Sequence, residues 1–131
     1  MDRVFLVLAA AFGLLGVAAG AFGAHALRAR VPAERLASFE TGARYLMYGA
    51  FAMFGVEWFR AAGPDQVAES WAGVCLAAGT VAFSGSLFAL ALTGRRRWGA
   101  LTPVGGVLLL AGWALLGVAA LTAPLRFAFF R

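Results

Sequence analysis

Long stretches without a charged residue restrict this chain to few folds. Three such stretches occur, at residues 4–24, 71–93 and 98–125. Each is long enough to cross the hydrocarbon core of a bilayer, which takes about 20 residues of helix. A backbone surrounded by hydrocarbon must satisfy its own hydrogen bonds, so these segments are predicted to be helices.

The composition excludes most other classes of protein. Hydrophobic residues make up 63% of the chain and charged residues 13%, with a mean hydropathy of +0.85, whereas soluble domains contain about 25% charged residues. Too little polar surface is left to cover a water-soluble globule, so a soluble enzyme and a disordered tail are both excluded. We predict an all-α fold, an integral membrane four-helix bundle with short loops, forming a single transmembrane domain over residues 1–131.

The second of the four predicted spans, residues 43–60, is the least apolar because it contains charged residues near both ends. Pro32 is able to open a helix, and a helix over residues 33–60 would be about 42 Å long. That length exceeds the thickness of the bilayer core. We therefore predict that residues 33–42 form an interfacial amphipathic helix ahead of the span. Its apolar side contains Leu36, Phe39 and Ala43.

The basic residues orient the predicted spans. All eleven are arginines, and with six acidic residues they give a net charge of +5. The loops after the first and third spans contain Arg28, Arg30, Arg35, Arg44, Arg95, Arg96 and Arg97. The other side contains Arg3, Arg60, Arg126 and Arg131. Since arginine-rich loops stay in the cytoplasm, this asymmetry predicts a multi-pass protein of the cytoplasmic (inner) membrane with both termini outside, and it requires no nucleic-acid partner.

The first span has a competing interpretation as a secretory signal peptide. Arg3 precedes its apolar run, and Ala24-His25-Ala26 resembles a cleavage site. The run is nevertheless long enough to span a bilayer, and cleavage would deliver the arginine-rich first loop to the outside. We therefore favour a membrane helix.

Small residues recur at helical spacing in three of the spans. They are Gly13, Gly16, Gly20 and Gly23 in the first, Gly73, Ala77, Thr80 and Ser84 in the third, and Gly105, Gly112 and Ala119 in the fourth. Small side chains allow membrane helices to approach closely. These positions are predicted to be helix-packing residues, either inside one chain or, alternatively, between the chains of a homo-oligomer.

A few polar residues have no routine role in such a protein. Glu40, Arg44 and Tyr48 are four residues apart and share one helical face, and His25 is expected at the same membrane level. This candidate polar cluster would relay protons, hold an anionic head group, or only stabilise helix ends. Glu57 and Arg60 are expected to pair near the opposite surface. The residues predict no catalytic site, no metal site and no cofactor.

Several sequence blocks together resemble the small bacterial inner-membrane family typified by YgdD and YwdK. The blocks are Gly20–Leu27, Phe39–Tyr48, Phe83–Gly94, Leu101–Gly106 and Ala111–Trp113. The resemblance implies a four-helix membrane protein with relatives in mitochondria and no established biochemical activity. The family often has Tyr-Gln-x-Tyr-His in the second span, where this chain has Leu46 and Gly49 in place of the Gln and the His. That departure weakens a two-histidine relay or metal site.

Together these features predict a non-enzymatic structural or accessory membrane protein. Its partners would be membrane lipids and either further copies of itself or a larger membrane complex. The competing hypothesis is a small transporter or proton-coupled channel that uses His25, Glu40 and Arg44. A membrane enzyme acting on lipid is a third class, supported only by the same cluster.

Overall fold

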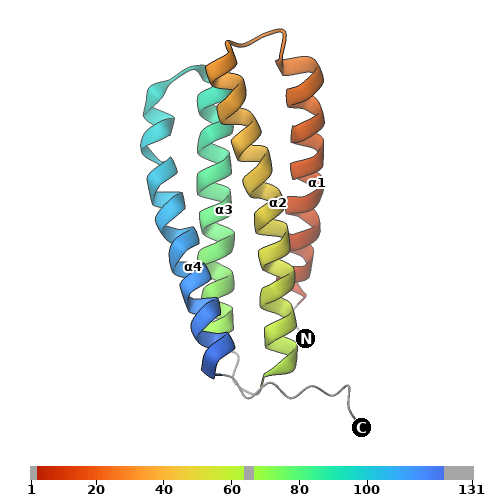
Figure 1. The fold of residues 1–131 in the computed structure, drawn as a ribbon, viewed down its shortest axis with the longest axis vertical. Coiled ribbons are helices and arrows are strands. Elements are labelled where there is room, and N and C mark those ends of the chain that lie inside the picture. Colours follow the sequence, from red (N-terminus) through yellow and green to blue (C-terminus); the bar gives the residue numbers. More distant parts are fainter. Residues whose placement is uncertain (1–2, 64–66, 123–131) are drawn as a thin grey trace.

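A computed structural model describes residues 3–63 and 67–122, and in this part of the chain four long helices form the fold (Figure 1). The long helices are α1 (Val4–Phe22), α2 (Ala33–Ala62), α3 (Val67–Thr93) and α4 (Thr102–Thr122). A π-helical turn, η1 (Gly23–Leu27), extends α1, and a 3₁₀ turn, η2 (Arg96–Ala100), precedes α4. The predicted all-α four-helix class is confirmed. The last residues of the predicted fourth span, 123–125, lie outside the described residues, as do Arg126 and Arg131.

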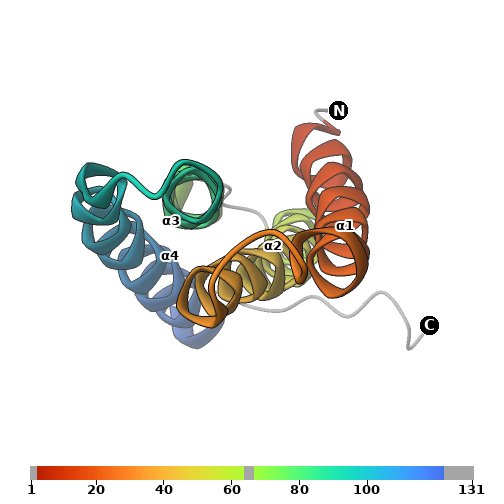
Figure 2. The same cartoon turned by 90° about the horizontal axis from the view of Figure 1, so that it is seen from above.

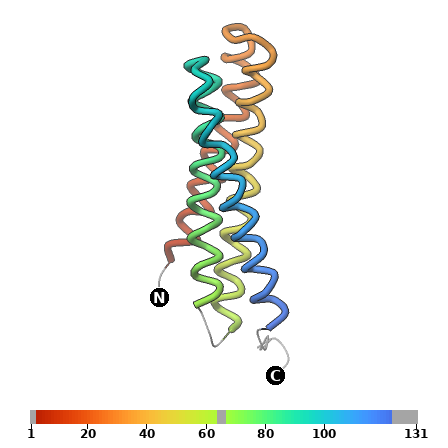
Figure 3. The backbone as a smooth tube through the Cα atoms, turned by 90° about the vertical axis from the view of Figure 1, so that its left-hand side faces the viewer, coloured from red at the N-terminus to blue at the C-terminus, as the bar shows by residue number. Residues whose placement is uncertain are grey.

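The helices alternate in direction and pack mainly on their neighbours in the chain. Extensive contacts join α1 to α2, α2 to α3 and α3 to α4, whereas α2 and α4 meet only narrowly. Seen from above, α2 lies between α1 on one side and α3 and α4 on the other (Figure 2). The N-terminal end of α1 and the C-terminal end of α4 lie at the same end of the bundle (Figures 1 and 3).

Helix α2 is continuous where the sequence suggested two segments. The predicted interfacial helix 33–42 and the predicted span 43–60 form one helix of 30 residues. Its apolar face explains the continuity: Phe39 and Ala43 are buried, so the first turns pack on α1 and α3 as the later turns do. By length and composition three helical segments are able to cross a membrane, namely Val4–Leu27, Val67–Thr93 and Arg96–Thr122. Helix α2 is the longest but also the least apolar of the four.

The connections at the arginine-rich end are short and tied by hydrogen bonds. Gly94 adopts a positive φ of 69°, which allows the chain to turn directly after α3, and its N–H donates to the Leu90 carbonyl. From the neighbouring helix, Arg35 Nε donates to the Ala91 carbonyl over 2.7 Å. This bond satisfies one of the carbonyls that the end of α3 leaves without a helical partner.

Apolar side chains and glycines share the interior of the bundle. Met53 and Val56 of α2 and Leu76 of α3 are completely buried, and they join Phe5 and Phe12 of α1 in one cluster. Glycines allow the helix backbones to approach closely around this cluster. A Cβ atom at Gly105 would contact the Phe83 backbone, and one at Gly79 would lie 2.8 Å from the Leu109 nitrogen. The α3–α4 contact therefore depends on glycine from both helices.

We expect Gly105→Ala to separate α3 from α4. Its new methyl group would overlap backbone atoms of Phe83, which cannot rotate away, so the variant should lose about 1–3 kcal/mol of stability, as overpacked cores do. Thermal unfolding in detergent measures the loss. The control is Gly117→Ala, also on α4, whose Cβ would meet no atom within 4 Å. Equal stability of both variants would contradict the close α3–α4 contact.

Candidate functional site

The candidate polar cluster lies on the outer surface of the molecule. Glu40, Arg44 and Tyr48 follow one face of α2 and are exposed, and His25 is exposed in η1. Within the described residues, these four side chains form no hydrogen bond or ion pair with one another. The structure therefore brings three of them onto a common face and places His25 at the same end of the bundle, without a buried polar centre.

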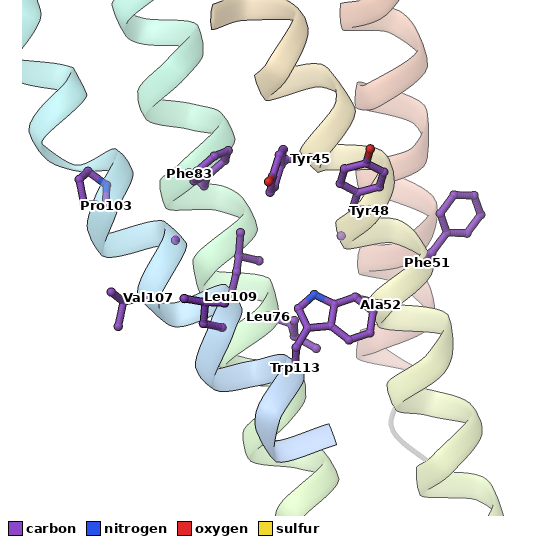
Figure 4. A pocket seen from close by; sticks show the side chains of 13 residues that line it. Tyr45, Tyr48, Phe51, Ala52, Leu76, Phe83, Pro103, Val107, Leu109 and Trp113 are labelled. Atoms are coloured by element: carbon purple, nitrogen blue, oxygen red, sulfur yellow. The ribbon is translucent and has the colours of Figure 1, made fainter. Parts of the chain in front are cut away.

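A groove opens between α2 and α4, and α3 forms its floor (Figure 4). Of the candidate polar cluster, only Tyr48 lines this groove. The volume of the groove is about 710 Å³. The groove is lined by Tyr45, Tyr48, Gly49, Phe51, Ala52, Leu76, Phe83, Pro103, Gly106, Val107, Leu109, Leu110 and Trp113. No sequence pattern predicted this groove, because its two walls come from helices that are not consecutive in the chain.

Aromatic side chains with polar tips shape the groove. Tyr45 packs on Phe83 with 4.2 Å between ring centroids, and on Tyr48 edge to face at 5.2 Å. Trp113 reaches from α4 toward α2 and closes one end (Figure 4). Tyr48 and Trp113 remain about half exposed, at 48% and 49%. The groove therefore combines apolar walls with a few hydrogen-bonding groups, the usual character of a small-molecule site.

Among the described residues, the buried hydroxyls of Ser84 and Ser86 bond to neighbouring helices, whereas that of Thr80 bonds within its own helix. Ser84 Oγ donates to the Gly42 carbonyl of α2 over 2.7 Å, and Thr80 Oγ1 donates to the Leu76 carbonyl over 2.7 Å. The hydroxyls of Ser86 and Thr102 are also 2.7 Å apart. Because each of these hydroxyls is satisfied by the protein itself, none is available for chemistry in the core.

Most of the predicted helix-packing glycines lie at contacts between helices. A Cβ at Gly16 would lie 2.9 Å from Met47 Sδ, and one at Gly23 would lie 3.1 Å from the Phe39 ring. Gly13 is in ordinary contact distance of Ala50, and Gly105 and Gly112 face α3. Gly20 differs, because a Cβ there would meet no atom within 4 Å. It lies on the open surface of α1.

A second group of charged residues lies at the opposite end of the bundle. As expected, Arg60 and Glu57 pair, with 3.1 Å between Nη1 and Oε2, and the Arg60 guanidinium lies 5.2 Å from the centre of the Phe5 ring. Glu69 is nearly fully buried nearby at 2% exposure, and among the described residues its Oε2 has no hydrogen-bond partner. Sequence reasoning missed Glu69, although it lies four residues before Gly73 and so continues the small-residue face of α3.

We expect Ser84→Ala to weaken the α2–α3 contact. The substitution removes the interhelical hydrogen bond to Gly42, and such bonds contribute about 1 kcal/mol in membrane proteins. Thermal unfolding in detergent measures the effect. Ser38→Ala is the matched control, since the Ser38 hydroxyl bonds only to Glu34 of its own helix. Equal stability of the Ser84 variant and the control variant would show that the interhelical bond contributes nothing measurable.

Comparison with known proteins extends over most of the chain. A family model described as "Protein of unknown function (DUF423)" matches residues 19–106. The UPF0382 inner membrane protein YgdD of Escherichia coli K12 is 41% identical over 129 residues, which cover 92% of this chain and 91% of YgdD. A UPF0382 membrane protein of Staphylococcus saprophyticus is 40% identical over 87% of this chain and 93% of its own length.

The same relationship holds for a UPF0382 membrane protein of Staphylococcus epidermidis, which is 39% identical over 91% of this chain and 96% of its own length. No solved structure matches the chain. Because the family model matches residues 19–106 and the relatives cover about nine tenths of the chain at 39–41% identity, this chain belongs to the DUF423/UPF0382 family of membrane proteins.

Proposed function

We propose that this protein is a non-enzymatic structural or accessory component of the cytoplasmic membrane, which acts by holding partner helices against its own helix faces. The proposal rests on how the surface of the protein is divided between helices and connecting segments. Between the described helices, the connections at residues 28–32 and 94–95 are very short. Over residues 3–63 and 67–122, nearly all of the surface available to a partner therefore belongs to the helices.

The proposed location rests on the helices and on the relatives. Three helical segments are long and apolar enough to cross a membrane, and YgdD is named an inner membrane protein. Helix α2 lies between α1 and α3 and runs alongside both (Figures 1 and 2). Its 30 residues span about 45 Å, so we infer that it crosses the bilayer together with them and that the chain has four spans.

The proposed orientation places both termini outside. Five of the eleven arginines, Arg28, Arg30, Arg95, Arg96 and Arg97, lie in the connection between α1 and α2 or in the connection between α3 and α4, and Arg35 lies in the first turn of α2 at the same end. Such arginine-rich loops are retained in the cytoplasm. We expect a periplasm-active reporter such as alkaline phosphatase to be active when fused after Arg131 and inactive when inserted after Arg96. A second reporter, one that is active only in the cytoplasm, should be inactive when fused after Arg131. Activity of that reporter would show that the C-terminus lies inside and would contradict this orientation.

The transporter alternative receives no support from the geometry. It requires a water-filled path lined by His25, Glu40 and Arg44, and all three side chains lie on the outer surface. The buried hydroxyls of Thr80 and Ser84 are bonded to backbone carbonyls. The contact surfaces of the helices are therefore the better basis for a function.

Helix α1 offers the most suitable face for a partner helix. It packs chiefly on α2, which leaves an opposite face with Leu14, Val17 and other apolar residues more than half exposed. Gly20 lies one turn after Gly16, between the α2 contact and this face, and leaves a shallow gap at its edge, since a Cβ there would meet no atom within 4 Å. A glycine on an otherwise apolar membrane surface permits close approach of a second helix.

We expect the protein, crosslinked in native membranes and gently solubilised, to be recovered with a stoichiometric partner, either a further copy or a larger complex. Gly20→Leu should reduce that recovery at least several-fold without changing thermal stability, because the added side chain fills the gap. Gly117→Leu on α4, whose Cβ also meets no atom within 4 Å, is the control. Recovery of the wild-type protein only as single protomers would contradict the accessory role, and equal effects of both variants would contradict the α1 face.

A further inference from the structure

The charged residues of α2 are aligned with the groove. Glu40, Arg44 and Tyr48 are each one helical turn apart, and Phe51 continues the same face. Tyr48 and Phe51 both line the groove. The carboxylate and the guanidinium therefore lie along the α2 rim of the groove, beyond its end at the arginine-rich side.

The contacts between helices give the depth of these residues. Gly42 lies against Ser84 of α3, and Phe83 of α3 lies against Gly105 of α4. Arg44 is therefore level with the first turn of α4, and Glu40 lies one turn, or about 6 Å, closer to the membrane surface. From the surface inward, the order is a carboxylate, a guanidinium, a phenol hydroxyl and then the apolar groove.

Arg44 and Glu40 are costly at this depth unless a partner compensates their charges. Both side chains are exposed, and within the described residues neither has an ion-pair partner. The neighbouring cation Arg35 is already bonded to the Ala91 carbonyl. A lipid head group in the surrounding membrane is able to supply this compensation.

We propose that the groove binds one phospholipid with a primary ammonium head group, phosphatidylethanolamine. Arg44 binds the phosphate. Glu40 accepts hydrogen bonds from the ammonium group, which in such a lipid lies closer to the membrane surface than the phosphate. The Tyr48 hydroxyl donates to an ester carbonyl one turn deeper. An acyl chain then lies along Leu76 and Leu109 toward Trp113. The order of the lipid's ammonium, phosphate and ester groups therefore matches the order of Glu40, Arg44 and Tyr48 along α2.

The charges of the site favour this occupant over two others. An apolar partner helix in the groove would leave the charges of both Arg44 and Glu40 without a partner. A phospholipid with an anionic head group would satisfy Arg44 but would leave Glu40 facing negative charge. Only a head group with both signs matches both residues.

Native mass spectrometry of the full-length protein tests the proposal. The protein is released from nanodiscs of phosphatidylethanolamine and phosphatidylcholine in equal amounts, and separately from nanodiscs of phosphatidylglycerol and phosphatidylcholine. We expect one retained phosphatidylethanolamine per protomer. Glu40→Gln should lower the preference for phosphatidylethanolamine over phosphatidylcholine about fivefold, as expected for one partly exposed ion pair. Arg44→Gln should lower retention of every phospholipid by a similar factor or more.

The controls are Glu34→Gln and Arg30→Gln, which remove exposed charges at the same end of the molecule, away from the groove. Thermal unfolding verifies that all variants are folded, which is expected because the substituted side chains are exposed. Equal retention of phosphatidylethanolamine and phosphatidylcholine by the wild type would overturn the proposal. So would stronger retention of phosphatidylglycerol, or identical behaviour of the Glu40 and Glu34 variants. These outcomes do not depend on a protein partner, so they test the lipid site separately from the accessory role.

Discussion

Close approach of helix backbones is the interaction on which the rest of this structure depends. Lipid chains are as apolar as leucine, so burial of apolar surface does not drive helices together in a membrane, and contact between the backbones has to do so. At Gly42, Gly79 and Gly105 a side chain would collide with the neighbouring helix. Ser84 adds a hydrogen bond to the Gly42 carbonyl at the same level. These contacts set the spacing of α2, α3 and α4.

The groove is a consequence of this packing. Helix α4 is held against α3 by glycines from both helices, while α2 packs on the neighbouring side of α3. Helices α2 and α4 then meet only narrowly, near Gly55 and Leu116. Above that point their side chains do not fill the space between them, and the aromatic rings of Tyr45, Phe83 and Trp113 form its walls. The same geometry leaves Arg44 at the rim rather than in the core.

Particular residues mark the limit of sequence-based inference. Helical spacing was enough to predict that Gly16 and Gly105 face other helices and that Glu57 pairs with Arg60. It was insufficient for residues 33–42, because an amphipathic pattern fits both a helix at the membrane interface and the first turns of a longer buried helix. The burial of Glu69 was not predicted for a related reason. A charged residue just before an apolar run is normally assigned to a loop, whereas Glu69 is buried within α3.

The sequence by itself determined the four helices, their small-residue faces and the concentration of arginines at one end, because hydropathy and helical period are local properties. The tertiary structure alone decided what lies opposite each face. Glu40, Arg44 and Tyr48 share a face in any helix, but only the packing of α2 between α1 and α3 turns that face outward and aligns it with a groove. The reason is physical: a periodic pattern specifies a direction from one helix axis, whereas a site requires the relative positions of several axes.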